Sequence, residues 1–380
     1  MTGSKWKVQI GLMAWVVVGL LSGSVFGAEA VSQNTPKALP ERIRGITLKL
    51  SYATPEVVNR AADYGVNFIL FNMSAGKAVK PAPTAEDPFI PYQKQIDLLR
   101  DDLLPVCKKR GLKVALLFVP WGRNQDYFWQ SEKAGHYYDH WVKFWEVFAE
   151  EFKDDQTLVA YDLMGEPNYK KEQGNVWQDI LLPKGVEAVR KSDPRVWLIV
   201  EPGPWGMPSG FKTLKPVDDP YVMYGFHPYA PHGYLHQGVG PHKDTAAYAR
   251  GQRYPGKLQM FPGSPRVMWN KAKLKQYMAS AHQFALKHKV RMLAGEWGVV
   301  RWAPGGGQWT ADMISIFEEW NFDWCSFSLN GWNGWNPTFG PDDRGSLEAY
   351  GGHEDRPVLK AWKAGWALNQ DSNKAAVEPE

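Results

Sequence analysis

Cysteine is scarce in this sequence, and its scarcity excludes a fold that is held together by disulfides. The chain of 380 residues has two cysteines, Cys107 and Cys325. Small domains that rely on disulfides carry many more, at regular spacings. Cys107 falls in a helical segment and Cys325 in a late apolar segment, so we expect two buried thiols. A single bridge between them is the alternative.

A charge bias and several common motifs are also missing. The 44 basic and 40 acidic residues nearly balance, and no basic run stands out, so we expect no nucleic-acid partner. There is no H-E-x-x-H motif, which is typical of zinc proteases. No G-x-G-x-x-G follows an apolar segment, so a dinucleotide site has no support. We therefore expect neither a metal nor a cofactor.

Long hydrophobic runs are limited to one, residues 10–21, with two lysines before it. It is shorter than the roughly 20 residues that a membrane span needs. Small residues at 28–30 then fit a signal-peptidase site. We expect residues 1–30 to be a signal peptide and residues 31–41 a polar leader, giving a secreted or periplasmic protein without stable membrane association after cleavage. A retained anchor is the alternative.

Short apolar segments alternate with longer segments of helical periodicity. The expected strands are 44–50, 66–73, 112–120, 157–164, 196–200, 222–226, 290–295 and 323–329. The expected helices are 55–64, 93–110 (kinked or broken near Pro105), 137–155, 175–192, 271–288, 309–320 and 357–368. Uninterrupted apolar strands indicate a parallel sheet that is buried on both faces.

Eight such strands, nearly all separated by helices, predict an α/β fold with a single (β/α)8 TIM barrel. We assign residues 42–370 to this barrel and residues 371–380 to a disordered tail. An open doubly wound sheet is the alternative, but it would normally bring the dinucleotide motif that this sequence lacks.

Polar residues follow several expected strands, at the end where TIM barrels carry their active sites. Glu166 follows the fourth strand, His227 and Tyr229 the sixth, and Glu296 the seventh. Two carboxyl groups on facing strands suit glycoside hydrolysis, in which one protonates the leaving oxygen and the other attacks the sugar carbon. We expect burial to raise the pKa of one carboxyl, while hydrogen-bond donors keep the other ionised. Helix caps or loop ion pairs are the structural alternative.

Aromatic residues are abundant: 19 Trp, 16 Tyr and 17 Phe. Many tryptophans sit beside Gly, Pro or Asn, outside the periodic segments. Such loop positions favour flat faces that stack on sugar rings in a groove, since loops often carry function. Filling of a large core is the alternative. The tryptophans in question are Trp121, Trp205, Trp297, Trp302, Trp332 and Trp335.

The segments RGITL, YDLMGEP, GFHPYAPHGYLHQG, GEWGVVRWAP and FEEWNFDW together resemble glycoside hydrolase family 5, over most of the mature chain. The resemblance implies a TIM barrel that cleaves β-glycosidic bonds with retention of configuration. By position, Glu166 matches the acid/base and Glu296 the nucleophile. His227 and Tyr229 match the family's His-x-Tyr beside the nucleophile.

The resemblance also implies a polysaccharide or oligosaccharide substrate. We expect a β-glucan, as for cellulases and endoglucanases, and a monomeric enzyme. A mannan or a decorated glycan is the alternative substrate. The remaining substrate-binding residues that we expect are Asn72, Trp121, Asn168, Trp297 and Trp332.

The sequence departs from the family pattern around the expected acid/base. The family's asparagine before it is replaced by Gly165, and the family's strand-two arginine would fall near Leu70. We expect an open volume at Gly165 and a pocket that is remodelled as a unit, with Asn72 or Asn168 as replacement donors. The strand-three histidine is replaced around Pro120-Trp121, and the strand-eight tryptophan falls at Phe327.

Two rival functions stay open. A metal hydrolase is suggested by the histidines at 227, 232, 236 and 242, but the prolines and glycines between them argue against a helix that presents His232 and His236 on one face. A non-catalytic carbohydrate-binding barrel is suggested by the departures from the family. Because both glutamates are present, we favour the enzyme.

Overall fold

The computed structural model describes residues 35–74, 86–87, 89–120, 126–129, 134–169, 175–240, 243–339 and 355–375. The expected signal peptide, the first part of the leader and residues 376–380 lie outside this part of the chain. From Pro36 onward the chain forms one compact unit, so residues 36–41 belong to it. No helix in the described part has the length and apolar character needed to cross a bilayer.

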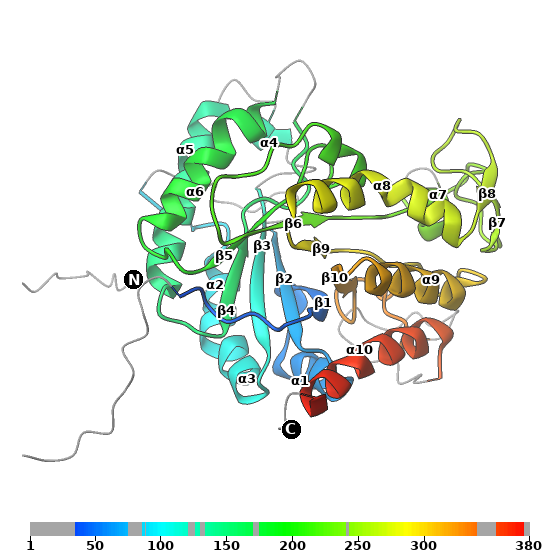
Figure 1. Ribbon diagram of the computed structural model, residues 1–380, viewed down its shortest axis with the longest axis horizontal. Coiled ribbons are helices and arrows are strands. Elements are labelled where there is room, and N and C mark those ends of the chain that lie inside the picture. Colours follow the sequence, from blue (N-terminus) through cyan, green and yellow to red (C-terminus); the bar gives the residue numbers. More distant parts are fainter. Residues whose placement is uncertain are drawn as a thin grey trace, which may run out of the picture. The chain divides into compact units, whose positions relative to one another are not determined.

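Eight parallel strands form a closed barrel (Figure 1). They run in chain order around it, and the last pairs with the first. The predicted single (β/α)8 barrel is therefore confirmed. The strands are β1(Arg44–Lys49), β2(Phe68–Ser74), β3(Lys113–Val119), β4(Leu158–Asp162), β5(Trp197–Val200), β6(Val222–Phe226), β9(Met292–Ala294) and β10(Asp323–Phe327).

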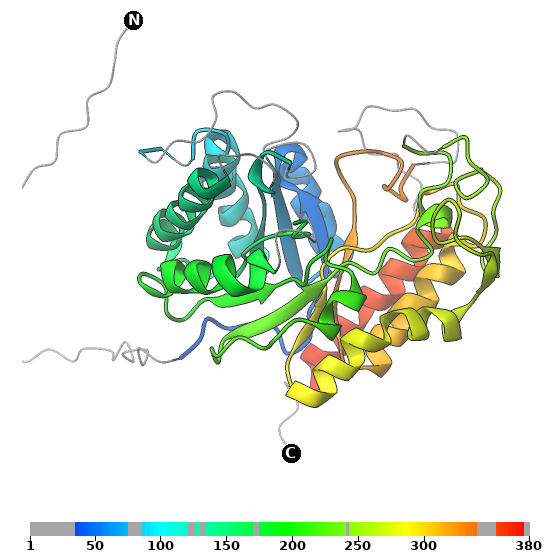
Figure 2. The same cartoon turned by 90° about the horizontal axis from the view of Figure 1, so that it is seen from above.

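Helices separate most of the strands. The α-helices are α1(Pro55–Asp63), α2(Gln93–Asp97), α3(Leu104–Lys109), α4(Asp126–Trp129), α5(Ala134–Phe152), α6(Leu182–Arg190), α7(His232–Leu235), α8(Lys271–His288), α9(Gly306–Glu319) and α10(Pro357–Ala375). Short 3₁₀ turns, η1(Leu50–Tyr52) and η6(Pro208–Lys212), follow β1 and β5. The helices α8, α9 and α10 lie side by side along one side of the barrel (Figure 2). Since α10 reaches Ala375, the helix extends past the expected end of the barrel domain at residue 370.

Two helices contain a proline without being broken by it. The helix expected to be kinked or broken near Pro105 continues through a π-helical turn, η2(Leu98–Leu103), directly into α3. Pro183 in α6 likewise follows a π-helical turn, η5(Trp177–Leu181). Because a proline ring clashes with the carbonyl four residues before it, the wider turn lets each helix continue.

Two hydrophobic layers support the strands. A small cluster fills the barrel interior and includes Leu70, Leu117 and Cys325. A larger one, which includes Cys107, lies between the strands and the helices. Both cysteines are buried and free, and they lie in different layers. The expected pair of buried thiols without a bridge is confirmed.

An insertion between β6 and α8 carries α7 and a small antiparallel hairpin, β7(Gly256–Leu258) and β8(Val267–Trp269). The hairpin lies beside α7 in Figure 1. Sequence periodicity did not predict it, because strands of three residues are too short for alternation to be recognised. This insertion forms one side of the cavity described next.

Candidate active site

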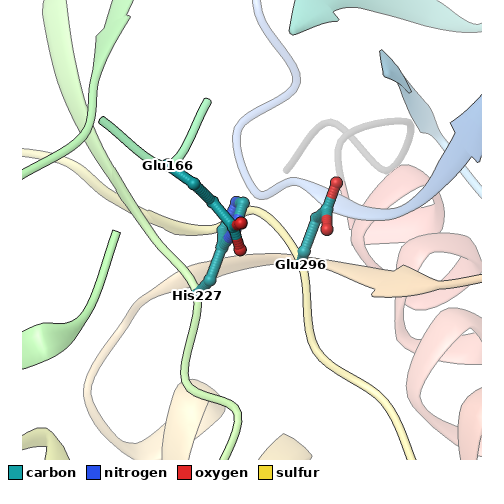
Figure 3. Close-up of side chains that lie close together, drawn as sticks. All are labelled: Glu166, His227 and Glu296. Atoms are coloured by element: carbon teal, nitrogen blue, oxygen red, sulfur yellow. The ribbon is translucent and has the colours of Figure 1, made fainter. Parts of the chain in front are cut away.

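Three titratable side chains meet where β4, β6 and β9 end (Figure 3). Glu166 comes four residues after β4, His227 directly after β6, and Glu296 two residues after β9. One ligand-type atom of each lies within 4.8 Å of those of the other two. The structure thus brings together the two glutamates that the sequence places 130 positions apart.

Glu166 stands on an unusual backbone. Its φ is 52°, in the left-handed region that residues other than glycine rarely adopt. Its N–H donates a hydrogen bond of 2.7 Å to Oε2 of Glu201, and Pro167 follows. The side chain is 34 % exposed, so it can reach both its protein partner and a bound molecule.

Glu296 is more deeply buried and is held by two donors. The amide of Asn72 donates to Oε1 at 2.6 Å, and the hydroxyl of Tyr229 to Oε2 at 3.4 Å. Burial raises the pKa of Glu296 above its ordinary value and the charge of Glu166 adds to this, whereas His227 and Asn72 oppose it. Asn72, expected as a replacement donor, therefore contacts a carboxyl group of the site.

His227 is buried between three carboxyl groups. Its Nδ1 lies 2.8 Å from Oε1 of Glu166, and its Nε2 lies 2.9 Å from Oε1 of Glu201, at an angle outside that of a regular hydrogen bond. Burial by itself would lower the pKa of His227, but the charges of Glu201 and Glu296 outweigh it. The pKa of His227 therefore lies well above its ordinary value.

Sequence reasoning missed Glu201. It follows β5 directly, is fully buried, and contacts both Glu166 and His227. Its position in the segment VWLIVEP, at the end of an apolar strand, carries the same signal that identified Glu166 and Glu296. An acidic residue at the end of a fifth barrel strand could have been found by that signal.

A cavity of about 730 Å³ opens above these side chains. Aromatic residues form much of its wall, in keeping with ligand sites that combine apolar surface with a few polar groups. The ring of Trp335 contacts those of Tyr229, His236, Phe327 and Trp332. The other lining residues are Lys49, Asn72, Ser74, Val119, Glu166, Trp205, Met207, His227, His232, Met260, Phe261, Tyr277 and Glu296.

The loop tryptophans divide between cavity and core. Trp205, Trp332 and Trp335 line the cavity. Trp297, expected to bind substrate, is fully buried and packs against rings of α9 and β10, which corrects that expectation. Neighbouring side chains of an extended chain point to opposite sides, and here Glu296 faces the cavity while Trp297 faces the helices.

Of three other residues considered as sugar contacts, two do not line the cavity and one lies outside the described residues. Trp302 packs under the guanidinium of Arg250 at 4.4 Å, and its ring N–H donates to the carbonyl of Gln237. Asn168 is half-buried and is not among the side chains that line the cavity. Trp121 lies outside the described residues.

The volume expected at Gly165 is filled. A Cβ placed on this glycine would lie 2.5 Å from Cδ2 of Leu117 and 3.4 Å from a methyl of Val119. Leu117 stands on β3 and points into the barrel interior. The expectation of an open space is therefore wrong, because a cross-strand leucine occupies the place that a larger residue would need.

His232 is the first residue of the four-residue helix α7, and His236 is its C-cap, outside the helix. Their rings nevertheless stack with centroids 3.8 Å apart, so the expectation that the two side chains do not share one face is wrong. Nδ1 of His236 faces the carbonyl of His232, and burial lowers the pKa of His236 to about 3. Among the described residues, neither belongs to a group of three potential metal ligands. His242 lies outside them.

A closed barrel with this carboxyl pair at its carboxyl-terminal mouth is the architecture of a glycoside hydrolase. The family model for Cellulase (glycosyl hydrolase family 5) matches residues 33–333, and the chain belongs to this family. It is a glycoside hydrolase that acts on carbohydrate.

Relatives of this chain include an endoglucanase and a cellodextrinase. Endoglucanase C of Acetivibrio thermocellus is 26% identical over 254 residues, 60% of this chain and 73% of the relative. Cellodextrinase A of Ruminococcus flavefaciens is 22% identical over 209 residues, 53% of this chain and 57% of the relative. A solved hyperthermophilic endo-β-1,4-glucanase in complex with substrate shares the fold, with a TM-score of 0.65 and 20% identity over 85% of this chain and 96% of its own.

Proposed function

We propose that this chain hydrolyses a β-glucan by double displacement, with Glu166 as acid/base and Glu296 as nucleophile. The observation that carries the proposal is the short separation of their carboxyl groups. One carboxyl oxygen of Glu166 lies within 4.8 Å of one carboxyl oxygen of Glu296. Retaining glycosidases hold their carboxyl groups about 5 Å apart, whereas inverting ones leave roughly 6.5 Å or more for a water molecule.

In the first step, the ionised carboxylate of Glu296 attacks the anomeric carbon while Glu166 gives its proton to the departing oxygen. The glycosidic bond breaks as the bond to Glu296 forms. In the second step, Glu166 takes a proton from a water molecule, whose oxygen displaces Glu296. Two inversions return the original configuration. His227, whose pKa lies well above its ordinary value, stands beside Glu166, where a positive charge on its imidazole would balance the charge that Glu166 acquires between the two steps.

The aromatic wall supports a glucan substrate. Trp205, Trp332 and Trp335 offer faces to the cavity, and flat equatorial sugar rings suit such surfaces. The names of the relatives, endoglucanase and cellodextrinase, agree with this substrate class. Because the volume at Gly165 is filled, this position gives no support to the alternative of a decorated glycan.

We further propose that the enzyme acts outside the cytoplasm. The support is the pattern in residues 1–30, a short apolar run followed by small residues. N-terminal sequencing of the exported protein would locate the cleavage.

The assignment is tested with two isosteric variants. Glu296→Gln should abolish turnover, because an amide cannot attack the sugar carbon. Glu166→Gln should lose much less activity on an aryl glycoside with a good leaving group, which needs little protonation, and azide should restore it as a glycosyl azide of retained configuration. Product configuration is followed by NMR during hydrolysis of cello-oligosaccharides.

The matched control is Glu187→Gln, on the exposed face of α6, which should behave as wild type. Initial product of inverted configuration would overturn the mechanism. Binding of cello-oligosaccharides without any hydrolysis by the wild type would instead favour a carbohydrate-binding barrel.

A further inference from the structure

Two fully buried carboxyl groups lie behind the imidazole of His227. Asp162 is the last residue of β4, and Glu201 directly follows β5. Glu201 is well held: Oε2 accepts the N–H of Glu166 at 2.7 Å, Oε1 lies 2.9 Å from Nε2 of His227, and the indole of Trp177 donates to its backbone carbonyl. It therefore contacts both ends of the His227–Glu166 pair.

Asp162 is held in a different way. Among the described residues, no N–H or O–H reaches either of its carboxyl oxygens in hydrogen-bond geometry, although the N–H of Met164 approaches. Its carboxyl group faces that of Glu201 instead. Gly225 on β6 leaves room for the pair, because a Cβ there would lie 3.1 Å from Cγ of Glu201 and 3.6 Å from Oδ2 of Asp162.

Two ionised carboxylates in this position would repel each other inside a dry barrel. Like charges that share a buried site keep one proton between them, because both cannot ionise without a large cost. Burial and the charge of Glu201 raise the pKa of Asp162 well above its ordinary value. A hydrogen bond between two carboxyl groups also exists only if one of them is protonated.

We propose that Asp162 keeps its proton and donates it to an ionised Glu201, and that this pair holds His227 doubly protonated against Glu166. Asp162 and Glu201 are then positioning residues. The effect of Asp162 and Glu201 on catalysis rests on the proposed function, but their effect on the protonation of His227 does not.

The location of the proton follows from what each carboxyl group faces. Oε1 of Glu201 lies against the imidazole of His227, and its Oε2 accepts the N–H of Glu166, so both of its oxygens face groups that can donate. Asp162 faces another carboxyl group and the N–H of Met164, and the charge of His227 acts on it less strongly than that of Glu201. The other titratable groups that face His227 are Glu166 from the segment after β4, Glu296 from the segment after β9, and the hydroxyl of Tyr229.

Isosteric amides distinguish the two carboxyl groups. Asp162→Asn still offers a donor to Glu201 and imitates a protonated aspartic acid. Glu201→Gln keeps the acceptor for the N–H of Glu166 but removes the charge that faces His227. The imidazole of His227, assigned by comparison with the spectrum of His227→Gln, is titrated by nitrogen NMR in wild type and both variants.

In wild type and in Asp162→Asn, the imidazole should stay doubly protonated beyond neutral pH. In Glu201→Gln it should lose a proton at a pH lower by about one unit or more, since one adjacent charge is removed. The alkaline limb of kcat on cello-oligosaccharides should move down by the same amount in Glu201→Gln and stay in place in Asp162→Asn.

Other patterns overturn the proposal. A shift in Asp162→Asn with none in Glu201→Gln would place the proton on Glu201. No shift in either would make the pair purely structural, and shifts in both would mean that Asp162 carries charge. Should Glu201→Gln fail to fold, a neutral His227 in the wild type at pH 7 would overturn the proposal by itself. Because NMR needs no turnover, it gives a result even if the proposed hydrolysis fails.

Discussion

At the scale of single residues, the site depends on how Glu296 keeps a negative charge while buried. Burial works against its ionised form, and the amide of Asn72 and the charge of His227 work for it. The amide stands on β2, where the family carries an arginine two positions earlier. The carboxylate of Glu296 thus receives a hydrogen bond from a neutral donor.

This arrangement predicts a pH effect for Asn72→Ala. The hydrogen bond favours the charged form of Glu296, so its loss should raise the already raised pKa of Glu296 further. The proposed nucleophile must be ionised, and kcat/KM should therefore fall as pH drops through this pKa. We expect the acid limb of kcat/KM to move up by about one unit, the scale of one hydrogen bond to a carboxylate.

The pH dependence of kcat/KM, measured on a soluble aryl cellobioside, checks this shift. Ser74→Ala is the matched control, because Ser74 lies on the same strand and lines the same cavity. An acid limb that stays in place in Asn72→Ala would contradict the role given to this amide.

At the scale of elements, β3 and β4 are fitted to each other beside the site. The N–H of Gly165 donates to the carbonyl of Phe118, while Leu117 fills the space where a side chain at 165 would begin. A leucine on one strand is thus packed against a glycine that follows the next strand.

Gly165→Asn should therefore lower stability by about 1–3 kcal/mol, as overpacked cores do. Leu117→Ala alone should cost about 2–5 kcal/mol through the cavity that it leaves. In the double variant the amide can use that space, so the destabilisation should be smaller than the sum. Urea unfolding of the four proteins gives the coupling. Additive changes would mean that Leu117 moves aside freely.

The element scale also separates what the sequence could predict from what it could not. The eight barrel strands were predictable because each is an apolar run between turn residues, and Glu166, His227 and Glu296 because each ends one. The prediction that Trp297 binds substrate was wrong, because the sequence does not say which side of a strand end faces the cavity. The filling of Gly165 depends on Leu117, nearly fifty positions away, and the hairpin β7–β8 is too short to show alternation.

The proposed sharing of a proton between two buried carboxyl groups was harder to predict from the sequence. Asp162 and Glu201 look like ordinary strand ends one at a time, and their importance comes from facing each other across Gly225. Such pairs become visible only when strand order and register are known.

At the scale of the whole molecule, the two ends of the barrel differ: one carries the cavity with its carboxyl groups, and the other carries contacts that stabilise the fold. The opposite end from the cavity holds a buried ion pair, in which Nζ of Lys37 lies 2.7 Å from Oδ2 of Asp193. The same ammonium donates to the carbonyls of Phe152 and Leu158. In TIM barrels the end opposite the active site contributes to stability rather than to chemistry.

Lys37→Ala should therefore lower the free energy of unfolding by about 3 kcal/mol, because it leaves a buried carboxylate without its partner. Urea unfolding measures this loss, and kcat at the optimum pH should stay near that of the wild type below the unfolding transition. The double variant Lys37→Met with Asp193→Asn should recover much of the stability. An unchanged midpoint in Lys37→Ala would contradict the prediction.

Lys37 stands seven positions after the expected cleavage site at residues 28–30 and seven before the first strand. The segment that precedes β1 is therefore a structural part and not a spacer. A recombinant chain trimmed to the start of β1 would keep every catalytic group, yet it would lose the ammonium that neutralises Asp193. Trimming after residue 34 would retain it.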